Sequence, residues 1–143
     1  MLTCTRRLTF EAGHRVFGHE NKCAHFHGHS YKALITADGN LDAQGRIIDF
    51  SVLKAKIGGW IDAQWDHATL LNAADPFCAL WQPGGPLAGQ RHFLLPYNPT
   101  AENLAHYLLN VVAPQALHDT SVYVKAVVVW ETENCSAEAR KGA

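Results

Sequence analysis

The sequence lacks several features that would point to particular classes of protein. Its 12 Lys and Arg residues against 13 Asp and Glu leave a net charge of −1, so nothing favours binding to nucleic acid or to a membrane surface. The N-terminal stretch MLTCTRRLTFEAGH holds no long apolar run, and we expect neither a signal peptide nor a membrane-spanning helix. The four cysteines form no C-x-x-C pair. We therefore expect free thiols and a cytoplasmic protein rather than a disulfide framework.

The sequence also lacks internal repeats and low-complexity segments, which argues against a solenoid or a disordered tail. Apolar residues make up 48% of its 143 residues, enough for the core of one compact domain spanning residues 1–143. Nine histidines are present, a high number for this length, and they need an explanation.

The spacing of apolar residues predicts an α+β fold. Alternation typical of half-buried strands predicts five strands, over residues 2–15, 29–38, 46–50, 92–97 and 121–132. Helical spacing predicts two helices: the first is capped by Asp49 or Ser51 and weakened by Gly58-Gly59, and the second is capped by Thr100 and closed by Pro114. We interpret residues 73–91, which hold three prolines and three glycines, as a loop or a loop with one helical turn. The order predicts an antiparallel sheet with helices on one face, and its edges favour oligomerisation.

The segment CAHFHGH at residues 23–29 points to a metal site. His27 and His29 are two residues apart, so on a strand both side chains face the same way, with the small Gly28 between them. His25 has the same parity but would lie about 13 Å from His29 on an extended strand, too far to share one ion. The third ligand should therefore come from elsewhere, and His14, at the end of the first predicted strand, is the best candidate.

Cys23 has two interpretations from its position alone. As a fourth ligand it would complete a closed, structural zinc site. As a general base or nucleophile it would act beside an open site, where Lys22 and a nearby metal would both favour the thiolate. Spacing does not separate the two.

Six blocks, taken in order, resemble the family of 6-pyruvoyl-tetrahydropterin synthase and its bacterial relative, 6-carboxy-tetrahydropterin synthase of queuosine biosynthesis. They are FEAGH (10–14), CAHFHGHSY (23–31), GRIIDFSVLK (45–54), DHATLLN (66–72), NPTAEN (98–103) and ET (131–132). The resemblance implies a tunnelling fold: an antiparallel four-stranded sheet with two helices on one face, assembled as trimers or dimers of trimers whose sheets form a barrel.

The resemblance also implies roles for individual residues. Zinc would be held by the family's three histidines, which match His14, His27 and His29. The catalytic cysteine matches Cys23, the histidine of the DH block matches His67, and Asp66 beside it would orient that ring or cap a turn. The pterin-anchoring glutamate matches Glu131, with Thr132 at the same end. Thr100 and Glu102 fit a helix N-terminus, and we favour capping over ligand contact for both.

The implied substrate is 7,8-dihydroneopterin triphosphate. Three residues separate Cys23 from the HGH motif, a spacing similar to the bacterial branch, which loses triphosphate and acetaldehyde to give 6-carboxy-tetrahydropterin. Three departures leave the pyruvoyl-forming branch or a divergent pterin-binding paralogue open. The 73–91 loop is longer than compact members need, the DH block has one residue more before Asn72, and the tail lacks an aromatic residue. A zinc enzyme acting on another small substrate also remains open.

Overall fold

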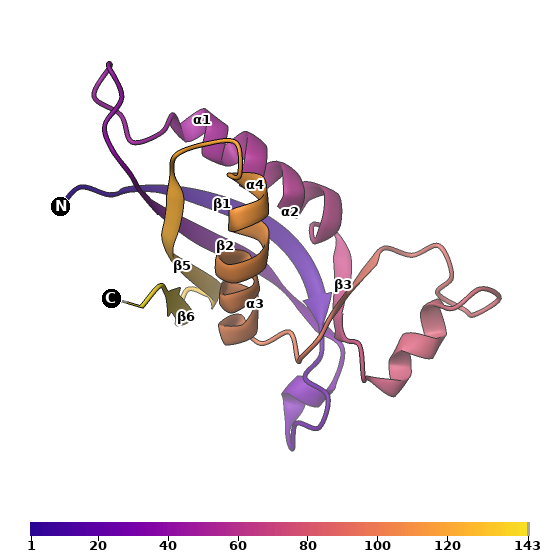
Figure 1. Ribbon diagram of the computed structural model, residues 1–143. Helices are drawn as coiled ribbons and strands as arrows, with labels where there is room; N and C mark the ends of the chain where they lie inside the picture. The colour runs from indigo at the N-terminus through magenta and orange to yellow at the C-terminus, as the bar shows by residue number, and fades with distance from the viewer. Residues whose placement is uncertain (143) are drawn as a thin grey trace.

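A six-stranded sheet in the order β4-β3-β1-β2-β5-β6 forms the centre of the computed structural model, which describes residues 1–142 (Figure 1). The strands are β1 (Cys4–His14), β2 (His27–Asp38), β3 (Ala68–Asn72), β4 (His92–Leu95), β5 (Tyr123–Thr132) and β6 (Cys135–Arg140). Strands β1, β2, β5 and β6 pair antiparallel, whereas β3 pairs parallel with both β1 and β4. The expected antiparallel four-stranded sheet is thus present, and two parallel strands extend it at one edge.

Two helical rods cover one face of this sheet (Figure 1). The first runs through α1 (Phe50–Leu53), the π-helical η2 (Lys54–Gly58) and α2 (Gly59–Gln64). The second runs through α3 (Ala101–Tyr107), the π-helical η4 (Leu108–Val112) and α4 (Ala113–Ala116). Two short 3-10 helices, η1 (Lys22–Ala24) and η3 (Pro76–Trp81), lie outside the sheet. The α+β prediction with two helices on one face is confirmed.

Alternation along the strands builds the core. Leu8, Phe10 and Tyr31 are buried on the helix-covered face, and the Phe10 and Tyr31 rings stack with centroids 4.8 Å apart. Gly58 lets the first rod approach this layer closely, because a Cβ at that position would lie 3.2 Å from a Leu8 methyl carbon. A glycine that weakens the isolated helix therefore serves its packing.

Both predicted helix starts are present with their caps. The Asp49 side chain accepts from the Ser51 amide at 2.8 Å, and Thr100 Oγ1 accepts from the Asn103 amide at 3.1 Å. Each cap satisfies a backbone donor that the first helical turn leaves unpaired.

Other sequence predictions are corrected. The segment 46–50 is not a strand, because its polar groups are used in a local turn: the Asp42 carboxylate accepts from the backbone amide and side chain of Arg46. Pro114 does not end the second rod, which continues to Ala116; proline is tolerated in the first turn of α4. Strands β3 and β6 were not expected as strands.

The 73–91 loop contains the anticipated helical turn as η3, whose N-terminus is capped by the Asp75 side chain. Within residues 1–142, no helix is both long and apolar enough to cross a membrane.

Candidate metal centre and active site

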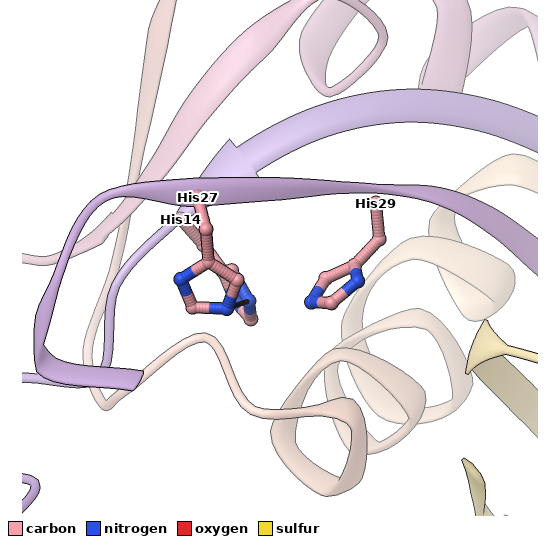
Figure 2. Close-up of side chains that lie close together, drawn as sticks. All are labelled: His14, His27 and His29. Atoms are coloured by element: carbon pink, nitrogen blue, oxygen red, sulfur yellow. Dashed lines mark hydrogen bonds between the residues drawn. The ribbon is translucent and has the colours of Figure 1, made fainter. Parts of the chain in front are cut away.

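The ends of β1 and β2 bring three histidines together. His14 pairs with His27 in the last register position of the antiparallel ladder, and His29 pairs with Ala12 two residues further along β2. All three rings point to the helix-covered side of β2 (Figure 2). Within residues 1–142, these three side chains form one group whose ligand atoms all lie within 4.8 Å of one another. The structure therefore brings together the three histidines that the sequence predicted as ligands, and they could hold a metal ion.

Backbone carbonyls orient two of these rings by contacting Nδ1, the nitrogen that does not face the other histidines. His14 Nδ1 lies 2.7 Å from the carbonyl oxygen of Pro99, and His27 Nδ1 lies 2.8 Å from the carbonyl oxygen of His25. A carbonyl only accepts, so each Nδ1 carries the proton and each Nε2 presents a lone pair. Metal-binding histidines are held in the same way in many proteins. His25, itself exposed, thus contributes its backbone rather than its ring.

The two Nε2 atoms of His14 and His27 face each other at 3.1 Å (Figure 2). Two Nε2 lone pairs at this distance repel each other, and a cation between them would remove that repulsion. Ligand nitrogens on a tetrahedral zinc are about 3.3 Å apart for bonds near 2.05 Å. The third nitrogen, His29 Nε2, is buried without a hydrogen-bond partner. The three residues therefore fit a metal ion, which would satisfy all three lone pairs.

Burial keeps the imidazoles of His14 and His29 in the neutral form that binds metal ions. It lowers the pKa of His14 to about 4, against the opposing hydrogen bond to Pro99, and the neighbouring His27 and His29 lower it further. Burial likewise lowers the pKa of His29, although the Glu131 carboxylate raises it. Near neutral pH both rings are neutral and able to bind a cation.

Glu131 lies at the open side of this cluster. Its Oε2 is 3.9 Å from His29 Nε2, and the register between β5 and β6 shifts at this residue, so that Glu131 falls between the pairs made by Trp130 and Thr132. A bulge of this kind leaves the extra residue unpaired and aims its side chain. Thr132 is exposed, and its hydroxyl accepts from the Asn134 amide in the following turn.

Tyr31 is a polar residue beside the cluster that the sequence analysis did not single out. Its hydroxyl is buried without a partner, and burial together with the Glu131 charge raises its pKa far above the usual value. The T-shaped packing of its ring on His29, with centroids 5.3 Å apart, places it beside the cluster. Strand parity, which puts residue 31 on the face of residues 27 and 29, was the available signal.

Cys23 lies in η1, within the loop that joins β1 to β2 just beyond the histidine pair. The metal group in the described part of the chain does not include its sulfur. Its carbonyl oxygen accepts from the Val16 amide at 2.7 Å, which closes the loop on itself. The Cys23 sulfur is thus not grouped with the three histidines, which does not favour its interpretation as a fourth ligand.

Asp66 and His67 form a pair on the opposite, open face of the sheet. His67 Nδ1 lies 2.9 Å from Asp66 Oδ2, and Asp66 Oδ1 accepts from the Glu11 amide at 2.8 Å. Partial burial raises the pKa of Asp66, but the bonds from Glu11 and His67 outweigh it and leave that pKa below its usual value. His67 borders a groove of about 460 Å³ that is also lined by Glu11, His29 and Thr69. The structure therefore does not bring His67 into the three-histidine group of its own chain.

Comparisons with known proteins agree with this architecture. The family model described as 6-pyruvoyl tetrahydropterin synthase matches residues 3–142. The 6-carboxy-5,6,7,8-tetrahydropterin synthase of Rickettsia bellii is 40% identical over 139 residues, covering 96% of this chain and 99% of the relative. That of Haemophilus influenzae is 27% identical over 146 residues, covering 96% and 98%.

One solved structure shares the fold at low sequence identity. The 6-pyruvoyl tetrahydropterin synthase of Plasmodium vivax superposes with a TM-score of 0.70 at 19% identity, and the match covers 100% of both chains. Matches to the family model and to relatives over nearly the whole chain leave one assignment: the protein belongs to the 6-pyruvoyl tetrahydropterin synthase family of tetrahydropterin-forming enzymes.

Proposed function

We propose that this chain is a zinc-dependent 6-carboxy-5,6,7,8-tetrahydropterin synthase, a lyase that converts 7,8-dihydroneopterin triphosphate with loss of triphosphate and acetaldehyde. The observation that carries the proposal is the cluster of three imidazole nitrogens with a carboxylate 3.9 Å away. Relatives named 6-carboxy-5,6,7,8-tetrahydropterin synthase support the choice of product. The reaction would belong to queuosine biosynthesis in the cytoplasm.

His14, His27 and His29 would hold the zinc ion. When bound, zinc would act as a Lewis acid toward the hydroxyl groups of the substrate side chain and so acidify the attached C–H bonds. The carbonyl oxygens of Pro99 and His25 would orient the rings of His14 and His27 toward the ion.

Glu131 would anchor the pterin. A carboxylate can accept two N–H bonds from the guanidine-like edge of the ring, a charge-assisted and bidentate contact. The position beside His29 would then place the side chain of the bound pterin toward the histidine cluster. Thr132 would border the same subsite, although its hydroxyl also serves the β5–β6 turn.

Cys23 would act as the general base that removes a proton from the substrate side chain, and His67, oriented by Asp66, would relay protons. Because His67 lies outside the three-histidine group of its own chain, we place the Asp66–His67 pair with the thiol of a neighbouring protomer. This requires a homo-oligomer, which we propose to be a trimer or a dimer of trimers.

The test is to incubate the zinc-loaded protein with 7,8-dihydroneopterin triphosphate and identify the products by mass. We expect 6-carboxy-tetrahydropterin and acetaldehyde. The Cys23→Ala variant should keep one zinc per chain and lose turnover, whereas Cys135→Ala, which removes an exposed thiol on β6, should keep both zinc and turnover. A 6-pyruvoyl product would instead assign the chain to the pyruvoyl-forming branch. Loss of zinc from Cys23→Ala would identify the Cys23 thiol as a zinc ligand.

A further inference from the structure

Arg15 connects the metal-bearing end of β1 to two loops. Its guanidinium binds the Asp75 carboxylate through two bonds, from Nε at 2.6 Å and from Nη2 at 3.0 Å. Its remaining nitrogen, Nη1, donates to the carbonyl oxygen of Ala24 at 3.1 Å. Ala24 follows Cys23 directly in the chain. The Arg15 side chain therefore contacts both the loop 15–26 that carries Cys23, here called the thiol loop, and the start of the 73–91 loop.

This contact is buried, and each nitrogen of the Arg15 guanidinium donates one hydrogen bond. The Asp75 side chain is 0% exposed and that of Arg15 is 13% exposed. The Asp75 carboxylate also accepts from the Phe77 amide at 2.9 Å, so the same group caps η3. The Arg15 guanidinium lies 4.1 Å from the centroid of the Phe77 ring, a cation–π distance. A buried, planar pair of this kind fixes orientation as well as distance.

The thiol loop is held at consecutive carbonyls. Val16, next to Arg15, donates its amide to the Cys23 carbonyl at 2.7 Å, and Arg15 donates to the Ala24 carbonyl. The two bonds fix the peptide groups that follow Cys23 and therefore the direction in which its side chain leaves the backbone. A second contact between the two loops comes from Phe26, whose ring stacks on Phe77 with centroids 5.5 Å apart.

We propose that Arg15 is a positioning residue for the Cys23 thiol, and that the 73–91 loop supplies, through Asp75, the fixed anchor that Arg15 requires. The inference rests on the proposed role of Cys23 as a base. It gives the long 73–91 loop a function in catalysis without contact with the reacting atoms. Lysine cannot replace Arg15, because one ammonium group cannot bind Asp75 bidentately and reach Ala24 as well.

Arg15→Lys and Asp75→Asn test this proposal. Lysine keeps the charge, and asparagine keeps an oxygen for the η3 cap, so both variants should fold. We expect kcat to fall about tenfold to a hundredfold, as is usual for small misplacements of a reacting group, with KM within about threefold. Bound zinc should stay at one per chain. Arg46→Lys is the matched control, because Arg46 forms ion pairs with Asp42 and Asp49 in the loop at the other end of β2 and should leave kcat unchanged.

Amide hydrogen exchange gives a readout that is independent of turnover. In both variants, exchange in residues 15–26 should accelerate by about tenfold or more, while exchange in the centre of β2 stays as in the wild type. Unchanged exchange, or faster exchange with unchanged kcat, would overturn the proposal. Loss of zinc together with kcat would also overturn it, because Arg15 would then act through the metal. If the wild-type protein shows no turnover, the proposed function fails, and hydrogen exchange still decides whether Arg15 orders the Cys23 loop.

Discussion

Gly28 separates two proposed zinc ligands, and replacing it with alanine should damage the metal centre. A Cβ built at Gly28 would lie 2.9 Å from the carbonyl oxygen of Ala12 on the neighbouring strand, whereas ordinary contacts begin at 3.4 Å. That neighbour is backbone within an antiparallel ladder and cannot rotate away. The strands must therefore separate by about 0.5 Å between the His14–His27 pair and the position of His29.

This displacement is large for a metal site, since metal–ligand distances are usually kept within about 0.2 Å. We expect Gly28→Ala to lower the free energy of unfolding of the zinc-free protein by about 1–3 kcal/mol, the usual cost of overpacking. Zinc affinity, measured by competition with a chromophoric chelator, should fall about tenfold or more. Urea unfolding of the zinc-free variant measures the free energy of unfolding separately from zinc affinity.

Gly13→Ala is the matched control, because Gly13 is the cross-strand partner of Gly28. A Cβ there would come no closer than 3.6 Å, to the carbonyl oxygen of His27. The free energy of unfolding of Gly13→Ala should stay within about 0.5 kcal/mol of the wild-type value, and its zinc affinity should be unchanged. Equal zinc affinity and stability in Gly28→Ala and Gly13→Ala would refute the argument from close approach.

Three further predictions concern the pKa of His14, the pterin anchor and the second helix cap. In zinc-free protein, stability should fall as the pH drops from about 6.5 toward about 4, by at most about 3 kcal/mol. Between these two pH values His14 is protonated in the unfolded chain but stays neutral in the folded chain, where its pKa is about 4. In His14→Gln, the free energy of unfolding from urea titrations should fall less over this pH range than in the wild type. Glu131→Gln should raise KM for the pterin about tenfold with zinc retained, whereas Glu138→Gln, on β6, should not; an unchanged KM in steady-state kinetics would contradict the anchor. Thr100→Ala should cost about 1 kcal/mol in urea unfolding with KM unchanged, because its hydroxyl caps α3; a raised KM would instead indicate substrate contact.

The antiparallel centre of the sheet was readable from the sequence because its strands are half-buried. Residues 4–14 and 27–38 alternate between the helix-covered and open faces, and that alternation is visible in their residue types. Strand β3 is only five residues long and pairs parallel with its neighbours, so its apolar run carries no alternation. Strand β6 is an exposed edge of small and charged residues, which lack strand propensity.

Parity along one strand predicted two ligands, but the third depended on pairing between strands. His27 and His29 follow from the period of a strand, whereas the pairing of His14 with His27 depends on the geometry of the loop between them. The carbonyl of Pro99, which orients His14, comes from a residue 85 positions away. Every residue has a backbone carbonyl, so residue type does not indicate which carbonyl accepts from a histidine. Sequence reasoning could therefore not identify these acceptors.

The conformation of His67 bears on the homo-oligomer proposed above. His67 has a φ of 60°, uncommon for a residue other than glycine, and its amide donates to the Glu11 carbonyl at 2.6 Å. Its side chain is nevertheless 74% exposed, so no packing within the chain repays the strain. The ring is oriented by Asp66, is exposed, and lies outside the three-histidine group, so it is accessible to a neighbouring protomer in the proposed homo-oligomer. Oligomerisation would therefore complete the active site as well as cover the sheet edges.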